Sequence, residues 1–526
     1  MRRGMSNRLR CALAVFALAS VAACAAPSED ATNETEDDLT SLTARSRRLW
    51  FQGKVFVAPG SSDAQILSAV RAQAQTAFGA MRTDDIAVNS RELKEIDTAT
   101  FRKRDVQVVD TSREGDPGTP MLEVKYTYKD DAVVGMRHAT RTSVPLAVMS
   151  PGYRSQTERI LRECTPNDSH SRDFASTAWY IFEPSLRQCQ EAIKKEQDGI
   201  TQDRAKLTDR RAQVTKSEVD RLYLPITARL GADKTNRGAS YPDYHRLYKG
   251  GVKEDKLVVS LVYGLIDHDH GGPADDYNFG ELMTTLDKVM AARGEFKVVD
   301  TPVDLGRFEL PSGRVLEGVS FADAVRWKTS WSTPPGMSSA DKTAAIKLFA
   351  EKIYRKWITV ERTVNVKIGD EAPKDVGVQL MFYYGADRDS APHKFATKNS
   401  DVILYNGHSY IGSGPLDPTR FTRDDFSKAY QILWVDGCVS YNYYHKDYIP
   451  LKEGGTKNLD LITNGLEAPS YRSGLAMGQF LARFLDGQGA SYKDLLEAAD
   501  DTDALRVVDG ELDNEWRPER FPLVVR

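Results

Sequence analysis

The sequence has no long apolar run, no excess of basic residues and few cysteines. No segment approaches the roughly 20 consecutive apolar residues that a membrane-spanning helix needs, so we expect none. Lys and Arg number 71 against 75 Asp and Glu, a net charge of −4, and nothing in this balance suggests nucleic-acid binding. The sequence does have a 41% hydrophobic composition over 526 residues, which predicts two or three domains with ample cores.

The first 24 residues have the pattern of an export signal. Four arginines precede a short apolar run, residues 12–19, and small residues then lead to Cys24. Val21-Ala22-Ala23-Cys24 resembles the lipobox of bacterial lipoproteins, which implies removal of residues 1–23 and diacylation of the Cys24 thiol. The alternative is ordinary cleavage near Ala23 beside an incidental cysteine.

The residue after Cys24, Ala25, is not the aspartate that retains such lipoproteins at the inner membrane. The resemblance therefore implies an outer-membrane lipoprotein, facing the periplasm or the cell surface, with the N-terminal lipid as its only membrane contact.

Three segments precede the C-terminal part of the chain. Residues 24–48 are acidic and poor in large apolar residues, which predicts a disordered tether, with folding beginning at Leu49. Residues 49–150 predict an α+β domain whose first helix is capped by Ser62 with Gln65 in a capping box. Residues 151–250 predict a helical connector. Within it, apolar residues recur every seven positions between Leu186 and Leu222, which predicts one long charged helix that acts as a spacer or, alternatively, binds a partner.

The five cysteines divide by position. Cys11 and Cys24 lie in the export signal and at its end, which leaves Cys164, Cys189 and Cys438. In an oxidising compartment we expect Cys164 and Cys189 to form a disulfide around a polar loop. Cys438 is then alone, and is either a buried inert thiol or a reactive one.

From residue 251 to 526 the pattern predicts an α/β domain with a mostly parallel sheet flanked by helices. Ligands gather at the carboxyl ends of strands in such sheets. We expect helices over 279–292 and 339–357, and strands over 257–265, 296–300, 377–384, 402–405, 432–435 and 459–463.

Two of these strands stop at residues that can carry chemistry. One ends at Gly407-His408-Ser409 and another at Gly437-Cys438. If the strands are parallel neighbours joined by a helix over 421–430, His408 and Cys438 lie side by side as a cysteine–histidine dyad. An imidazole can lower the pKa of a thiol and later protonate a leaving amine. The glycines would leave room for the substrate backbone, and the Cys438 amide would stabilise an oxyanion.

These motifs resemble the caspase/gingipain/separase superfamily of cysteine peptidases, often called clan CD, over roughly residues 256–500. The resemblance includes a first βαβ unit that ends in the strand at 296–300. It implies a caspase-like fold, with His408 as general base and acid and Cys438 as nucleophile of a peptide-bond hydrolase acting on peptide or protein substrates. The family has glycine after the histidine, where this chain has Ser409 and places Gly407 before it. That glycine's amide contributes to the family's oxyanion hole, so a caspase-like module that binds without cutting is the first rival reading, and a structural envelope lipoprotein is the second.

A further candidate is the polar loop Asp267-His268-Asp269-His270. The two histidines are suitable metal ligands, but no third or fourth ligand stands at a telling spacing, so we assign no metal site and expect no cofactor. A solvated loop at the mouth of the site is the simpler interpretation. Its two aspartates could instead favour a basic substrate side chain or a calcium ion.

Overall fold

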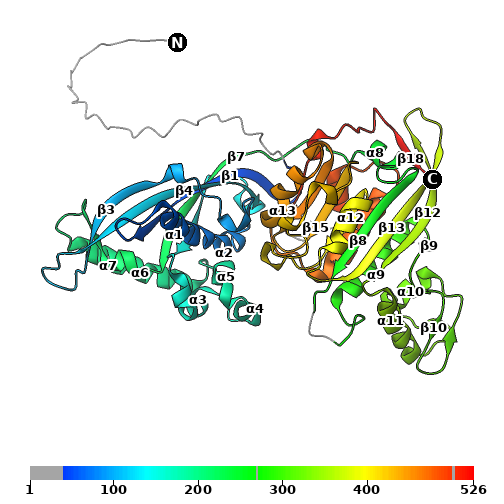
Figure 1. The fold of residues 1–526 in the computed structure, drawn as a ribbon, viewed down its shortest axis with the longest axis horizontal. Helices are drawn as coiled ribbons and strands as arrows, with labels where there is room; N and C mark the ends of the chain where they lie inside the picture. The colour runs from blue at the N-terminus through cyan, green and yellow to red at the C-terminus, as the bar shows by residue number, and fades with distance from the viewer. Residues whose placement is uncertain (1–38, 268–270, 500–503) are drawn as a thin grey trace, which may run out of the picture. The chain divides into compact units, whose positions relative to one another are not determined.

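The computed structural model describes residues 39–267, 271–499 and 504–526, which fold around two large β-sheets (Figure 1). Cys24, the lipobox and most of the predicted tether lie outside the described residues. Within those described ranges, no helix is long and apolar enough to cross a bilayer.

The first sheet has seven strands in the order β5-β7-β1-β4-β3-β6, with β2 also paired to β4. All its pairings are antiparallel except that of β3 with β6. Its strands are β1 Ala44–Val57, β2 Ile86–Val88, β3 Arg102–Val109, β4 Thr119–Gly135, β5 Ser143–Met149, β6 Gln213–Thr215 and β7 Tyr223–Asp233. Its helices are α1 Asp63–Gln75, α2 Ala77–Arg82, α3 Thr157–Cys164, α4 Ser169–Asp173, α5 Ala178–Ile181, α6 Arg187–Ala205 and α7 Lys216–Asp220.

The second sheet has nine strands in the order β17-β16-β15-β14-β8-β13-β12-β18, with β9 also paired to β12. Its centre is parallel, from β13 through β8, β14 and β15 to β16, and the pairings outside this centre are antiparallel. Its strands are β8 Lys256–Gly264, β9 Lys297–Asp300, β12 Trp357–Ile368, β13 Lys374–Ala386, β14 Val402–Asn406, β15 Gln431–Asp436, β16 Leu459–Asn464, β17 Arg506–Asp509 and β18 Leu523–Val525. A separate hairpin pairs β10 Phe308–Glu309 with β11 Val315–Leu316.

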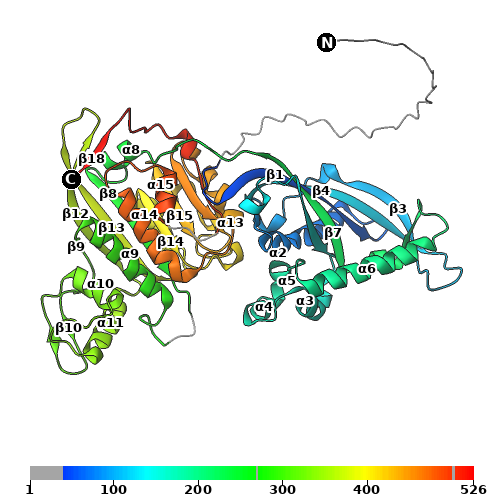
Figure 2. The same ribbon diagram turned by 180° about the vertical axis from the view of Figure 1, so that it is seen from behind.

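Helices cover both faces of this second sheet. Figure 1 shows α12 and α13 in front of it, and Figure 2 shows α9, α14 and α15 on the opposite face. The helices are α8 Tyr244–Tyr248, α9 Tyr277–Arg293, α10 Phe321–Thr329, α11 Ser339–Ile353, α12 Ala391–Asn399, α13 Ser440–Tyr448, α14 Ser473–Phe484 and α15 Tyr492–Ala498.

Alternation of side chains along the central strands produces two cores. On β15, Ile432 and Trp434 face the core under α9 and α14, whereas Leu433 and Val435 face the core shared with α13. The second core runs on without a break into the first sheet and α2. The module around the first sheet, residues 39–233 (the N-terminal module), is therefore packed against the α13 side of the second sheet.

Several predicted elements are confirmed. Ser62 and Gln65 form the capping box of α1, and Ile66, Val70 and Ala74 are buried. The Cys164–Cys189 disulfide is present, joining α3 to α6. The chain is mixed α/β as predicted, although β1 begins at Ala44, before the predicted start of folding at Leu49.

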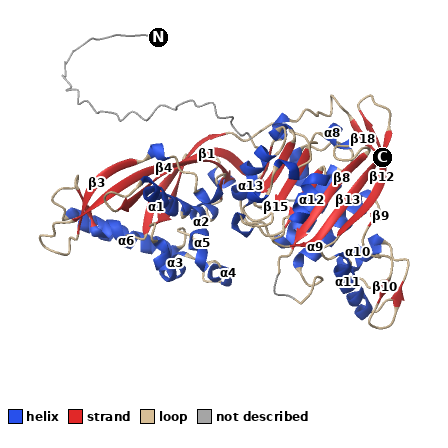
Figure 3. Ribbon diagram, viewed as in Figure 1, coloured by secondary structure: helices blue, strands red, loops and turns tan. Residues whose placement is uncertain are grey.

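Two predicted helices are wrong. The charged helix predicted over 186–222 ends at Ala205 (Figure 3), because the Asp209 carboxylate accepts the amides of Arg211 and Ala212 and turns the chain. The heptad spacing of Leu207 and Val214 was coincidental, since Val214 lies in β6.

The helix predicted over 421–430 is only a 3₁₀ turn at Arg423–Asp425. The Lys452 ammonium donates to the carbonyls of Ser427 and Ala429, and the Ser427 amide donates to Thr397 O. Because these peptide groups form their hydrogen bonds outside the segment, they are not available for the hydrogen bonds of a helix.

The predicted first βαβ unit is also wrong. Strand β9 does not lie parallel to β8 but pairs antiparallel with β12 near the edge of the sheet. The second sheet is accordingly mixed, with antiparallel strands outside its parallel centre.

Candidate functional site

The predicted dyad residues follow the ends of two adjacent parallel strands. β14 ends at Asn406 and β15 at Asp436, and these two residues are partners in the register. A Cβ built on Gly437 would lie 3.3 Å from the Gly407 carbonyl oxygen and 3.4 Å from the Ser409 Cβ. The two turns that carry His408 and Cys438 are therefore in contact, as the spacing of the motifs predicts.

The turn that carries Cys438 is sharp and strained. Val439 has φ 54°, a left-handed conformation that is unfavourable for a β-branched residue by roughly 1–3 kcal/mol. It is held by the Val439 amide, which donates to Leu466 O at 3.0 Å. Ser440, which begins α13, donates its hydroxyl to Val435 O and accepts the Asn464 amide, both at 2.8 Å. These bonds fix the thiol between the end of β15 and the start of α13.

His408 is oriented by a backbone carbonyl. Its Nε2 lies 2.9 Å from the Ile266 carbonyl oxygen, which belongs to the loop after β8. A carbonyl oxygen can only accept, so Nε2 must carry the proton and Nδ1 is then the nitrogen that can take one up. The Tyr405 hydroxyl donates to His408 O at 2.8 Å, and the ring of Tyr410 packs edge-on against the imidazole at 5.4 Å.

Cys438 is a half-buried residue, and its environment disfavours the thiolate. Burial, followed by the nearby Glu467 carboxylate, raises the pKa of the thiol to about 11, while a hydrogen bond from the Ala468 amide and the charge of Arg82 act in the opposite direction. The resting cysteine is therefore a neutral thiol.

Glu467 connects this site to the N-terminal module. Its carboxylate forms an ion pair with Arg82 at 2.9 Å and accepts the Tyr180 hydroxyl at 2.7 Å. The Arg82 guanidinium stacks over the Tyr180 ring at 4.8 Å. No sequence pattern links these three residues, because α2, α5 and the loop after β16 are far apart in the chain.

The two glycines are required by the turns themselves, and their predicted role of leaving room for a substrate stays a prediction. A side chain at Gly407 would collide with the Tyr405 phenol, and one at Gly437 would press on the neighbouring turn. Ser409 has φ −82° and ψ −15°, a conformation open to any L-residue. Its position therefore does not need glycine to present an amide there.

The amides of Ser409 and Cys438 are the candidate oxyanion donors. Within the part of the chain that the structure describes, neither amide has a hydrogen-bond acceptor. Two N–H groups from adjacent turns that bond nothing else can serve a developing negative charge.

Neighbouring polar residues are engaged in structural contacts. His445 Nε2 lies 2.9 Å from Asp509 Oδ2 and its Nδ1 bonds the Thr463 hydroxyl, so His445 is no partner for Cys438. Asp436 is buried and forms a 2.9 Å ion pair with Arg506, which makes it more than a turn residue. Tyr441, Tyr443 and Tyr444 are buried in aromatic packing.

The predicted ion or substrate loop is described only in part. Asp267 donates its amide to Asp276 Oδ2 at 2.7 Å, whereas residues 268–270 lie outside the described residues. Among the residues with a described placement, no three His, Cys, Asp or Glu side chains are grouped as metal ligands.

Comparisons with protein-family models, with curated proteins and with solved structures each find no match to this chain.

Proposed function

We propose that the chain is a cysteine-type peptidase in which Cys438 is the nucleophile and His408 the general base and acid. The observation that carries the proposal is the contact between the two turns at the ends of β14 and β15, together with the His408 tautomer set by Ile266 O. Both are what a thiol–imidazole mechanism requires. The sheet order around the site, with the histidine and the cysteine after neighbouring parallel strands, further supports a caspase-like arrangement.

The chemistry follows from the protonation states. Because the resting thiol is neutral, its proton would pass to His408 Nδ1 as the sulfur attacks the substrate carbonyl carbon. The carbonyl oxygen gains negative charge, which the amides of Ser409 and Cys438 would stabilise. The imidazolium then protonates the leaving amine and a thioester remains. Water then attacks the thioester carbon and passes a proton to His408 Nδ1. The C–S bond breaks, the imidazolium returns that proton to the departing sulfur, and the carboxylic acid product is released from the neutral thiol.

A second candidate function is peptide binding without cleavage. It is favoured by the raised pKa of Cys438, on which burial and the carboxylates of Glu467 and Asp436 prevail over the charge of Arg82. In this reading the surface around His408 and Cys438 recognises a peptide but the thiol does not ionise.

The N-terminal sequence supports a cellular location for either function. We propose that Cys24 carries the lipid of an outer-membrane lipoprotein, so that the site faces the periplasm or the cell surface. Incorporation of labelled palmitate into the full chain, and its loss in Cys24→Ala, would support this. Equal labelling of both would refute it.

The function is tested by incubating residues 37–526 with a peptide library and identifying cleavage products by mass spectrometry. A peptidase cleaves some peptides, and Cys438→Ser and His408→Gln each remove that cleavage while the fold is retained. The binding alternative predicts peptides retained uncut by the wild type. Cleavage that survives in Cys438→Ser would exclude the proposed mechanism.

A further inference from the structure

We propose that Asp276 is a positioning residue that holds the Ile266 carbonyl against His408, an inference that rests on the proposed function. Asp276 is buried and is the N-cap of α9. One carboxylate oxygen accepts the Asn278 amide at 2.8 Å, and the other accepts the amides of Ile266 and Asp267 at 2.9 and 2.7 Å. One side chain therefore serves both the helix and the loop that reaches the imidazole.

Peptide planarity explains how Asp276 directs this carbonyl. The carbonyl of Ile266 and the amide of Asp267 belong to one trans peptide, so they point in opposite directions in a single plane. Because the Asp267 N–H points at Asp276, the Ile266 carbonyl is turned away from it and toward His408 Nε2 at 2.9 Å. The carboxylate thereby sets which imidazole nitrogen carries the proton.

A second residue of the same turn ties the two strand ends together. Asn278 donates to the carbonyls of Gly264 and Asn406 at 2.7 and 3.2 Å and accepts the Asn406 side-chain amide at 3.1 Å. Gly264 ends β8, and Asn406 ends β14 directly before the His408 turn. The start of α9 thus fixes the Ile266 loop relative to the backbone of His408.

Capping a helix requires one acceptor oxygen, whereas Asp276 uses two. The N-caps of α10, α11 and α15 are serines, and each accepts one amide within its own helix. Of the two carboxylate oxygens, the second accepts the loop amides. A serine at this position would therefore retain the bond to the helix amide and lose the bonds to the amides of Ile266 and Asp267. Asparagine has one carbonyl oxygen, so it can accept either the helix amide or the loop amides, and its NH₂ group then faces the other donors.

The test compares Asp276→Ser and Asp276→Asn with Ser338→Ala, a matched loss of the α11 cap away from the site. The first readout is the nitrogen NMR spectrum of the His408 imidazole in a Cys438→Ser background, identified by its absence in His408→Gln. The second is the labelling rate with a peptidyl thiol probe as a function of pH.

We expect the His408 tautomer to change from Nε2–H toward a mixture in Asp276→Ser, and the maximal labelling rate to fall at least tenfold at an unchanged half-saturating probe concentration. Asp276→Asn should change both less than Asp276→Ser, and Ser338→Ala should alter neither. A folded Asp276→Ser variant with an unchanged tautomer would overturn the inference. If the wild type is never labelled, the proposed function fails, while the tautomer comparison still decides the role of Asp276.

Discussion

Cys438 and His408 follow adjacent strands, but the charge that acts most strongly on the thiol, that of Glu467, comes from the loop after β16. Glu467 and, less strongly, Asp436 raise the pKa of the thiol, and Arg82 lowers it. At a pKa of about 11, roughly one thiol in a thousand is ionised at pH 8. The sequence predicts the two dyad residues from their motifs. It cannot predict that Glu467, Arg82 and Tyr180 lie near the thiol, because their contacts depend on packing between distant parts of the chain.

Glu467→Gln should lower the pKa of the Cys438 thiol, because it removes the largest unfavourable charge and leaves the Arg82 cation. We expect alkylation by iodoacetamide at pH 8 to become several-fold faster, with the midpoint of its pH profile shifted downward. Glu453→Gln, which changes an exposed residue paired with Lys428, is the control. An unchanged or slower alkylation in Glu467→Gln would show that this carboxylate does not govern the thiol.

At the scale of elements, the central strands of the second sheet were predictable because they are short apolar runs that stop at glycine turns. Strand β12 is not among the predicted strands, although its apolar residues alternate with polar ones, because the helix predicted over 339–357 extends to its first residue, Trp357, whereas α11 ends at Ile353. The irregular connection between β14 and β15 was mistaken for a helix because its partners, Lys452 and Thr397, are distant in sequence. Local patterns therefore predicted the elements of the site but not the segments that connect them.

Ser440→Ala should loosen the turn that carries the thiol. It removes the donor to Val435 O and leaves the buried Asn464 amide unpaired, at a cost of about 1–3 kcal/mol in the free energy of unfolding. Urea denaturation measures this cost. Thr343→Ala, an exposed hydroxyl on α11, should change stability by much less. Equal losses in the two variants would mean that Ser440 does not hold the turn.

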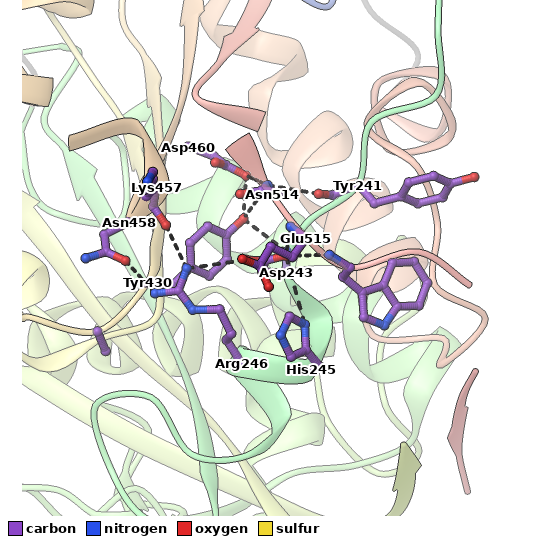
Figure 4. A network of polar contacts seen from close by, with 12 residues as sticks. Tyr241, Asp243, His245, Arg246, Tyr430, Lys457, Asn458, Asp460, Asn514 and Glu515 are labelled. Carbon is purple, nitrogen blue, oxygen red and sulfur yellow. Dashed lines mark hydrogen bonds and ion pairs between the residues drawn. The ribbon is translucent and has the colours of Figure 1, made fainter. Parts of the chain in front are cut away.

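At the opposite end of β16, Asp460 is buried in a polar network with Tyr430 and Asn514 (Figure 4). The hydroxyls of Tyr430 and Tyr492 and the Asn514 amide all donate to one oxygen, Oδ2. An asparagine carbonyl can therefore replace that oxygen without disrupting the donors. Burial raises the pKa of Asp460 to about 7.

Asp460→Asn should change how stability depends on pH. Since the folded-state pKa exceeds the unfolded value of about 4, the stabilising contribution is fully present below pH 4 and is lost as the pH rises through 7. Between pH 4.5 and 7.5 the wild type should therefore lose stability relative to Asp460→Asn, by up to the order of 4 kcal/mol. Urea denaturation at both pH values measures this, with Asp424→Asn as an exposed control. Parallel pH profiles would contradict the prediction.

For the whole molecule, the core shared by the first sheet and α13 makes residues 37–526 one compact unit. Asn442 on α13 donates to the carbonyls of Val88 and Ser90 and accepts the Glu92 amide. Sequence patterns separated the chain into modules but could not show this contact, because surface residues of each module become buried only when the two meet.

Asn442→Ala should destabilise the whole unit, since it leaves buried carbonyls unpaired. We expect a loss of about 1–3 kcal/mol and a single unfolding transition, measured by calorimetry. Asn365→Ala, which removes an exposed side chain that bonds Asp375, should cost far less. Two separate transitions in the wild type would show that the modules unfold independently.

Activation of Cys438 by His408 is measured by labelling residues 37–526 with a thiol-reactive peptidyl probe and, in parallel, with iodoacetamide. We expect peptidyl labelling of the wild type, none in Cys438→Ala, and a loss of at least tenfold in His408→Ala without a matching loss of iodoacetamide reactivity. Peptidyl labelling that is absent in the wild type, or indifferent to His408, would contradict it.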